Sequence, residues 1–204
     1  MKTRTDVINY LIEKNGYEEY LEIGVCNPAK NFNKIDCRNK TGVDPNKQTD
    51  YRMTSDKFFE QLSKNYMYDI IFVDGMHLYD YVLRDINNSL KHLNPKGVIV
   101  VHDCNPKKKN LVRPYEEYNG GPWCGTVWQA IAHLRMKRGD LQICVVDIDY
   151  GCGIIKKGQQ EVFKPFPVGH IPIMEDILIY DFLVEHREEL LNVCSVEEFK
   201  EDYA

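Results

Sequence analysis

Two buried-type strands of this 204-residue chain each end in an acid and a histidine, and one amphipathic helix separates them. They lie in Tyr68–Pro106, which reads YDIIFVDGMHLYDYVLRDINNSLKHLNPKGVIVVHDCNP. Asp74 and His77 follow the first strand, and His102 and Asp103 follow the second. In an open α/β sheet, ligands bind outside the carboxyl ends of the strands. These four ionisable side chains are therefore the predicted catalytic residues.

Strands and helices alternate along most of the chain, which predicts a doubly wound, mostly parallel sheet with helices on both faces. The predicted strands are Tyr20–Ile23, Thr41–Val43, Asp69–Val73, Val98–Val101, Gln142–Ile148 and Gly153–Ile155. A tight connection joins the last two, which indicates an antiparallel hairpin at the sheet edge. Thr126 and Gln129 are spaced as a capping box for the helix before that hairpin.

Length and composition predict one globular domain over residues 1–204, with a core at about 15–158 and a helical C-terminal extension at 159–204. The net charge is −5 and the basic residues are scattered, so a nucleic-acid partner is not expected. The seven cysteines lack Cys-x-x-Cys spacing, which favours reduced thiols and a cytoplasmic location. No apolar run has membrane-spanning length or the form of a signal peptide. A homo-oligomer stays open.

The ends of the first two strands have the features of a nucleoside site. Gly24 lets the backbone approach a ligand closely, and Asp44, 20 residues later, is placed to accept hydrogen bonds from ribose hydroxyls. The Glu22 side chain is placed to reach the same ligand or to form an ion pair with a basic residue. Val25–Lys30 contains no glycine, so the dinucleotide fingerprint is absent and NAD or FAD is disfavoured. A ligand with a ribose and no phosphates, such as S-adenosylmethionine, fits better.

The strings YLEIGV, GVDP, YDIIFVDGMHLYDYVLRDI and PKGVIVVHDCNP resemble the class I S-adenosylmethionine-dependent methyltransferases. The resemblance is greatest to the branch related to small-molecule and sugar O-methyltransferases, covers about residues 15–105 and implies a Rossmann-like fold. In that family the ends of the first four strands hold the amino-acid part, the ribose, the adenine and the methyl group, in that order. The resemblance therefore implies cofactor contacts at Glu22, Ile23, Gly24, Asp44, Ser55, Asp56, Asp74 and Gly75.

Methyl transfer from a sulfonium to a hydroxyl is an in-line displacement, and alignment of the two reactants can contribute roughly 7–11 kcal/mol. A general base would add about 10²–10⁴-fold. His77 and His102 are the candidates, because an imidazole titrates near neutrality. We favour His77, which lies three residues beyond Asp74 on a loop that can face the acceptor.

A magnesium ion is an alternative aid to the reaction. In related catechol-type methyltransferases, acids after the fourth and fifth strands hold this ion, and the resemblance places Asp74 and Asp103 there. Two carboxylates with waters and substrate suit a hard cation, but Cys104 stands where that group has an amide, and a thiol is a poor magnesium ligand. Strand alternation also predicts that His102 and Asp103 point to opposite sides.

The sequence therefore predicts a methyltransferase that uses S-adenosylmethionine to methylate a hydroxyl of a small molecule such as a sugar. One alternative is a metal-assisted, hydroxylase-like relative on the same scaffold. The other is a nucleoside-binding protein without catalytic activity.

Overall fold

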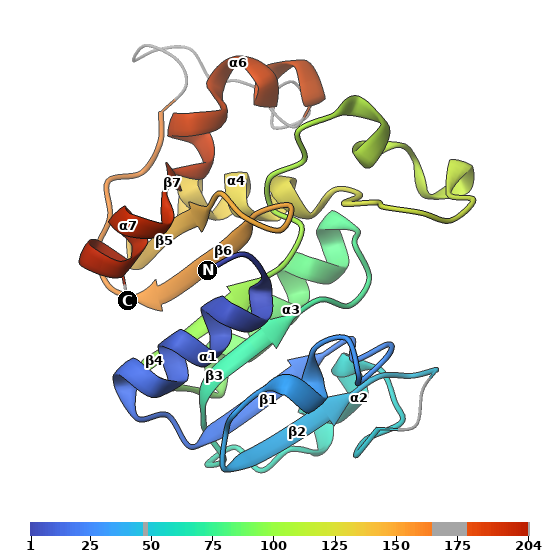
Figure 1. Ribbon diagram of the computed structural model, residues 1–204, viewed down its shortest axis with the longest axis vertical. Helices are drawn as coiled ribbons and strands as arrows, with labels where there is room; N and C mark the ends of the chain where they lie inside the picture. Colours follow the sequence, from blue (N-terminus) through green and yellow to red (C-terminus); the bar gives the residue numbers. More distant parts are fainter. Residues whose placement is uncertain (47–48, 165–178, 204) are drawn as a thin grey trace.

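A computed structural model of the chain describes residues 1–46, 49–164 and 179–203, and Figure 1 shows its ribbon. A seven-stranded sheet has the order β2-β1-β3-β4-β6-β5-β7. The strands are β1 Glu19–Ile23, β2 Asn39–Val43, β3 Tyr68–Val73, β4 Leu93–Val101, β5 Leu141–Val146, β6 Cys152–Lys157 and β7 Val193–Cys194. The β1, β2, β3 and β4 strands are parallel, whereas β6 runs antiparallel to both β4 and β5. The predicted fold class is confirmed.

Helices cover both faces of the sheet. They are α1 Arg4–Asn15, α2 Ser55–Gln61, α3 Tyr79–Lys91, α4 Val127–Lys137, α6 Tyr180–Leu191 and α7 Val196–Glu198, with short turns η1 Phe32–Lys34, η2 Lys109–Val112, η3 Tyr115–Glu117 and η4 Phe199–Tyr203. In Figure 1, α1 and α7 lie in front of the sheet, and α3 and α4 lie behind it. One apolar cluster joins the sheet to α1 and Phe199, and a second joins it to α2, α3, α4 and α6. None of the described helices has the length and apolar content needed to span a bilayer.

The α1 helix has well-defined ends. Thr3 and Asp6 form a capping box at its start, and Gly16 ends it with a φ of +66°, a conformation that favours glycine. The buried side of the helix consists of Val7, Ile8, Leu11 and Ile12. Arg4 is the first residue of α1, and this end of the helix lies near the candidate active site described below.

The strand that the resemblance places third is reduced to one parallel bridge, between Val43 and Tyr51. Thr54 then caps α2 by accepting a hydrogen bond from the amide of Lys57. The strand numbering of the family and of this chain therefore differs by one. Asp74, which the resemblance places after the fourth strand of the family, follows β3 in this chain.

Two sequence-based predictions differ from the structure. The Thr126 hydroxyl does not cap α4; its Oγ1 accepts a hydrogen bond from the amide of Tyr79 at 2.7 Å. Contact with the start of α3 thus replaces the expected local cap. In the predicted helical C-terminal extension, residues 159–164 are not helical and residues 165–178 lie outside the described residues. The first described helix of the extension is α6.

Candidate active site

A cavity of about 360 Å³ opens at the carboxyl ends of β1, β2 and β3. Its lining contains seven of the eight predicted cofactor residues: Ile23, Gly24, Asp44, Ser55, Asp56, Asp74 and Gly75. Asp44 and Asp74 therefore face one shared space.

Gly24 brings the end of β1 against the end of β3. Its φ is +88°, and a Cβ atom built on it would lie 2.3 Å from the backbone oxygen of Asp74. The Gly24 amide donates to the carbonyl of Val43 at 2.8 Å, and the Asp74 amide donates to the carbonyl of Ile23 at 2.9 Å. Any side chain at position 24 would separate the strand ends that form the cavity.

The Asp44 carboxylate is fixed by backbone amides. Oδ2 accepts from the amide of Cys26 at 2.9 Å, and Oδ1 accepts from the amide of Asn46 at 2.8 Å. A carboxylate offers about four lone-pair sites, so both oxygens retain capacity for ribose hydroxyls. Cys26 has a φ of +49°, so the loop turns here without the further glycines that are usual in the family.

Glu22 is the exception among the predicted cofactor residues, because its side chain lies on the face of the sheet that α1 covers. Its carboxylate accepts hydrogen bonds from Tyr20 Oη at 2.5 Å and from Asn31 Nδ2 at 2.9 Å. Along β1, Glu22 and Tyr20 share one face, and the cavity-lining Ile23 is on the other. Burial raises the pKa of Glu22 to about 7, and the charge of Asp74 adds to this increase.

Glu22→Gln is expected to stabilise the fold at pH 8 but not at pH 5. The raised pKa means that the folded state binds more protons between about 4.5 and about 7, so the free energy of unfolding falls as pH rises through this window. Glutamine keeps the shape and removes this penalty, which is on the order of 3 kcal/mol at about 1.4 kcal/mol per pKa unit. Urea denaturation at both pH values measures it. An equal effect of the substitution at pH 5 and pH 8 would contradict the prediction.

The four predicted catalytic residues form one cluster. His77 Nε2 lies 3.3 Å from Asp74 Oδ1, and His77 Nδ1 lies 3.2 Å from Asp103 Oδ2. His102 Nδ1 lies 3.3 Å from Asp74 Oδ1 and 3.2 Å from Asp103 Oδ2. Each carboxylate therefore contacts both imidazoles.

The expectation that His102 and Asp103 point to opposite sides is wrong. Asp103 has a φ of +61°, and it lies beyond β4, which ends at Val101. This left-handed residue interrupts the alternation of the strand and turns the carboxylate back toward His102. Both residues are buried, with 6% of each exposed.

The charges in the cluster stabilise one another. Burial alone would raise the pKa of Asp74, but His102 and His77 lower it below the usual value. Burial lowers the pKa of His77, and contacts with Asp74 and Asp103 outweigh it, so the net pKa is raised. For His102, burial is again outweighed by the surrounding carboxylates, and the pKa is well above normal.

Arg4 and Asp149 complete the cluster, and neither residue is predicted from the sequence. Arg4 Nη1 lies 3.1 Å from Asp149 Oδ2 and 3.1 Å from His102 Nε2, and its Nε lies 3.8 Å from Asp74 Oδ2. Asp149 follows the end of β5 by three residues, so the signal that identified Asp74, an acid after a strand, also applies to it. Nothing in the sequence pattern distinguishes Arg4 from an exposed basic residue on an amphipathic helix.

The long connection between β4 and α4 contacts His77. Trp123 stacks on the imidazole, with ring centroids 5.6 Å apart and an interplanar angle of 12°. His77 Nδ1 donates to the carbonyl of Trp123 at 2.8 Å, so in the neutral imidazole Nε2 is the nitrogen that carries no proton. A Cβ atom on Gly125 would lie 2.0 Å from the carbonyl oxygen of His77, so the backbones touch.

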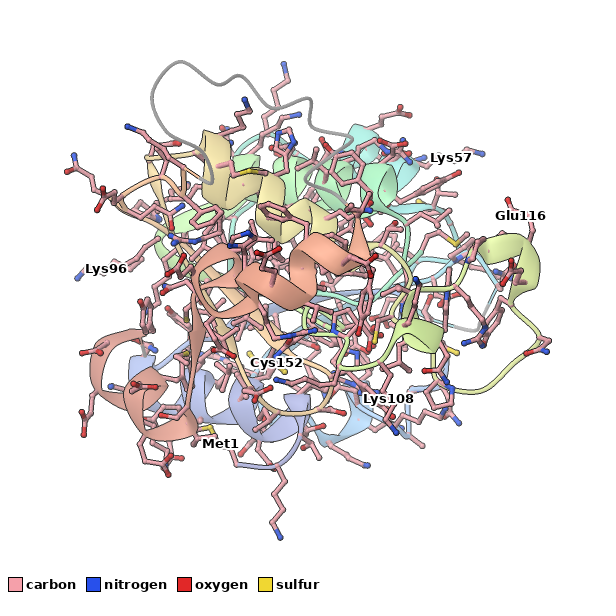
Figure 2. All side chains as sticks on the ribbon, turned by 90° about the horizontal axis from the view of Figure 1, so that it is seen from above. Met1, Lys57, Lys96, Lys108, Glu116 and Cys152 are labelled. Atoms are coloured by element: carbon pink, nitrogen blue, oxygen red, sulfur yellow. The ribbon has the colours of Figure 1, made fainter. Side chains whose placement is uncertain are left out.

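The outer part of this connection projects from the body of the molecule, as the yellow-green segment of Figure 1 shows, and Glu116 of η3 is at its margin in Figure 2. Tyr115 and Tyr118 lie there, 50% and 43% exposed. Their rings are 5.7 Å and 5.1 Å from that of Trp123. Three aromatic rings thus extend from His77 toward solvent.

Residues 13–104 match a family model described as a methyltransferase domain. Among solved structures, a putative caffeoyl-CoA O-methyltransferase from Staphylococcus aureus is 19% identical, with a TM-score of 0.56, and the alignment covers 76% of this chain and 82% of that one. An O-methyltransferase from Bacillus cereus in complex with S-adenosylhomocysteine is 13% identical, with a TM-score of 0.52 and coverage of 74% and 78%. The MycE methyltransferase of mycinamycin biosynthesis, with magnesium and S-adenosylhomocysteine, is 16% identical, with a TM-score of 0.50 and coverage of 82% and 51%. No curated protein sequence matches the chain.

The chain resembles the class I S-adenosylmethionine-dependent O-methyltransferases. The structural similarities confirm the predicted fold, and the family match indicates a methyltransferase domain over residues 13–104. The matched segment contains β1 to β4 and the predicted site residues, but it does not contain Arg4, Trp123 or Asp149.

Proposed function

We propose that this protein transfers the methyl group of S-adenosylmethionine to a hydroxyl of a small molecule, with the cofactor in the cavity between Gly24 and Asp44. The observation that carries the proposal is that Asp74 belongs both to this cavity and to the acid–imidazole cluster. A cofactor held by Asp44 would thus present its methyl group beside His77. The roles of the individual residues are part of the proposal.

In the proposed reaction, the acceptor oxygen attacks the methyl carbon, the carbon–sulfur bond breaks, and S-adenosylhomocysteine leaves. The proton of the acceptor hydroxyl passes to His77 Nε2, because Nδ1 already donates to the carbonyl of Trp123. Asp74, 3.3 Å from Nε2, stabilises the imidazolium that forms. Asp103 orients both imidazoles.

We further propose that the methyl acceptor is a sugar or another molecule with one flat face. The exposed rings of Tyr115 and Tyr118, together with Trp123, supply apolar contact area next to the proposed base. Aromatic side chains provide such area with few rotatable bonds. The hydroxyl of such an acceptor would face His77.

A divalent cation is compatible with the same cluster. Asp74, His102 and Asp103 each offer one ligand atom, and these atoms lie within 4.8 Å of one another. When bound there, the ion would polarise the acceptor hydroxyl. The imidazole nitrogen of His102 suits a transition-metal ion better than magnesium. Magnesium, which the MycE structure contains, stays an alternative raised by the sequence.

Calorimetric titration with S-adenosylhomocysteine tests the proposal. We expect binding to the wild-type protein and a loss of at least about 100-fold in affinity for Asp44→Ala, because two ribose hydroxyls lose a charged acceptor, each worth about 1.5–3 kcal/mol. Asp36→Ala, an exposed acid outside the cavity lining, is the matched control. Methylation assays with magnesium and with a chelator test the cation. Absence of S-adenosylhomocysteine binding to the wild-type protein would refute the proposed function.

The cellular setting also belongs to the proposal. A cytoplasmic location is supported by the seven cysteines, all of which are free thiols. A single domain over residues 1–204 and the lack of a nucleic-acid partner stay predictions from the sequence, and the oligomeric state stays open.

A further inference from the structure

Asp85 is a buried carboxylate in the cavity to which the proposed reaction gives no role. It lies in the second turn of α3, is 4% exposed and contributes to the lining of the cavity. Buried acids occur almost only with partners that compensate their charge. The contacts of Asp85 therefore indicate what the cavity is built to hold.

Only one of its two oxygens has a hydrogen bond within the described part of the chain. Ser55 Oγ donates to Asp85 Oδ1 at 2.6 Å. Oδ2 lies 3.7 Å from the position that a Cβ atom on Gly75 would take, and Gly75 also lines the cavity. Oδ2 is thus an acceptor beside the floor of the cavity, available to a donor on a ligand.

The neighbouring charges do not supply that donor. Arg84, the adjacent residue, directs its Nε to Asp56 Oδ1 at 2.9 Å and stacks its guanidinium over the ring of Tyr81 at 4.7 Å. Burial raises the pKa of Asp85 to about 6; the hydrogen bond from Ser55 opposes this increase, and the charge of Asp56 adds to it. Asp85 is therefore mainly ionised at pH 8, and a neutral N–H donor would stabilise it.

We propose that Asp85 is a specificity-determining residue that selects adenine by accepting a hydrogen bond from its exocyclic amino group at Oδ2. The inference rests on the proposed function, because it requires the adenosine of the cofactor in this cavity. Asp44 would hold the ribose where β2 ends, and the base would lie between the start of α2 and the Asp85 turn of α3. Ser55 keeps the carboxylate in place.

Deamination of adenine to hypoxanthine would replace the attraction between its amino group and Asp85 Oδ2 with repulsion. In hypoxanthine a carbonyl oxygen replaces the amino group, so two acceptors would face each other. A site built around a polar contact discriminates strongly against an analogue that lacks the matching group, because the buried partner is left unpaired. Asparagine at position 85 has nearly the same shape and offers an amide N–H to that carbonyl oxygen.

The test compares S-adenosylhomocysteine with S-inosylhomocysteine, its deaminated analogue, by calorimetry at pH 8. The wild-type protein is expected to bind the adenine compound at least about tenfold more tightly, which corresponds to one hydrogen bond to a charged group. Asp85→Asn is expected to reduce this ratio to below about threefold. Asp80→Asn, an exposed acid on the same helix, should keep the wild-type ratio.

The outcomes separate the two proposals. If neither compound binds to the wild-type protein, the proposed function itself fails. If S-adenosylhomocysteine binds but the wild-type ratio is close to one, or Asp85→Asn preserves the wild-type ratio, Asp85 does not read the amino group and the inference is overturned. The wild-type ratio needs no variant, so the inference stays testable even if Asp85→Asn does not fold.

Discussion

His77→Gln is expected to lower the rate of methyl transfer by about 10²–10⁴-fold, the range for loss of a general base. Glutamine cannot take up a proton at neutral pH, but its amide nitrogen can still donate to the carbonyl of Trp123. Because His77 does not line the cofactor cavity, the affinity for S-adenosylhomocysteine should change by less than about threefold. Single-turnover assays with radiolabelled cofactor measure the rate, and calorimetry measures the affinity.

His133→Gln is the matched control for this substitution. His133 Nδ1 contacts Tyr79 Oη at 2.8 Å, on the part of α4 that packs against α3, and it has no contact with the acid–imidazole cluster. Its rate should equal that of the wild-type protein. A His77→Gln rate within about threefold of wild type would remove His77 as the base and leave His102 as the other candidate.

Gly24→Ala is expected to abolish cofactor binding and to destabilise the fold by more than about 2 kcal/mol. Alanine at a φ of +88° is strained. Its Cβ atom would also lie within 2.5 Å of the backbone carbon and oxygen of Asp74, where no flexible side chain can yield. The strand ends must separate, which moves the Asp74 carboxylate relative to Asp44. Thermal unfolding and S-adenosylhomocysteine titration measure the two effects.

Gly16→Ala separates the two contributions to that effect. Gly16 also has a positive φ, +66°, but no atom lies within 4 Å of the position that its Cβ would take. This variant should pay only the conformational cost, about 1 kcal/mol, and bind the cofactor as the wild-type protein does. Equal destabilisation of the two variants would show that the contact with Asp74 contributes nothing.

Periodicity predicted most of the fold. The alternation of apolar strands and amphipathic helices identified β1, β2, β3 and β4, and the strand-end rule then placed Asp44, Asp74, His77 and His102 at one edge. This worked because parallel connections of one handedness bring all carboxyl ends together. The strand that the resemblance implies before Ser55 is reduced to the bridge between Val43 and Tyr51, and Thr54 still caps α2.

The remaining site residues depend on features that a pattern does not contain. Asp103 joins His102 only because its backbone is left-handed. Arg4 reaches the cluster from a helix that precedes the first strand, and its spacing to the other residues carries no signal. Asp85 has the appearance of a surface acid on an amphipathic helix, and burial beneath Ser55 depends on how α2 packs on α3. In each case tertiary packing, not local sequence, fixes the side chain.

The fluorescence of the chain comes from two tryptophans in different surroundings. Trp128 is enclosed in the core, 1% exposed, and its emission should be insensitive to ligands. Trp123 lies parallel to an imidazole ring, and a protonated imidazole is an efficient quencher of indole emission. The light emitted by Trp123 therefore reports the charge of the proposed base, so each proton that this base gains or loses is visible without any added label.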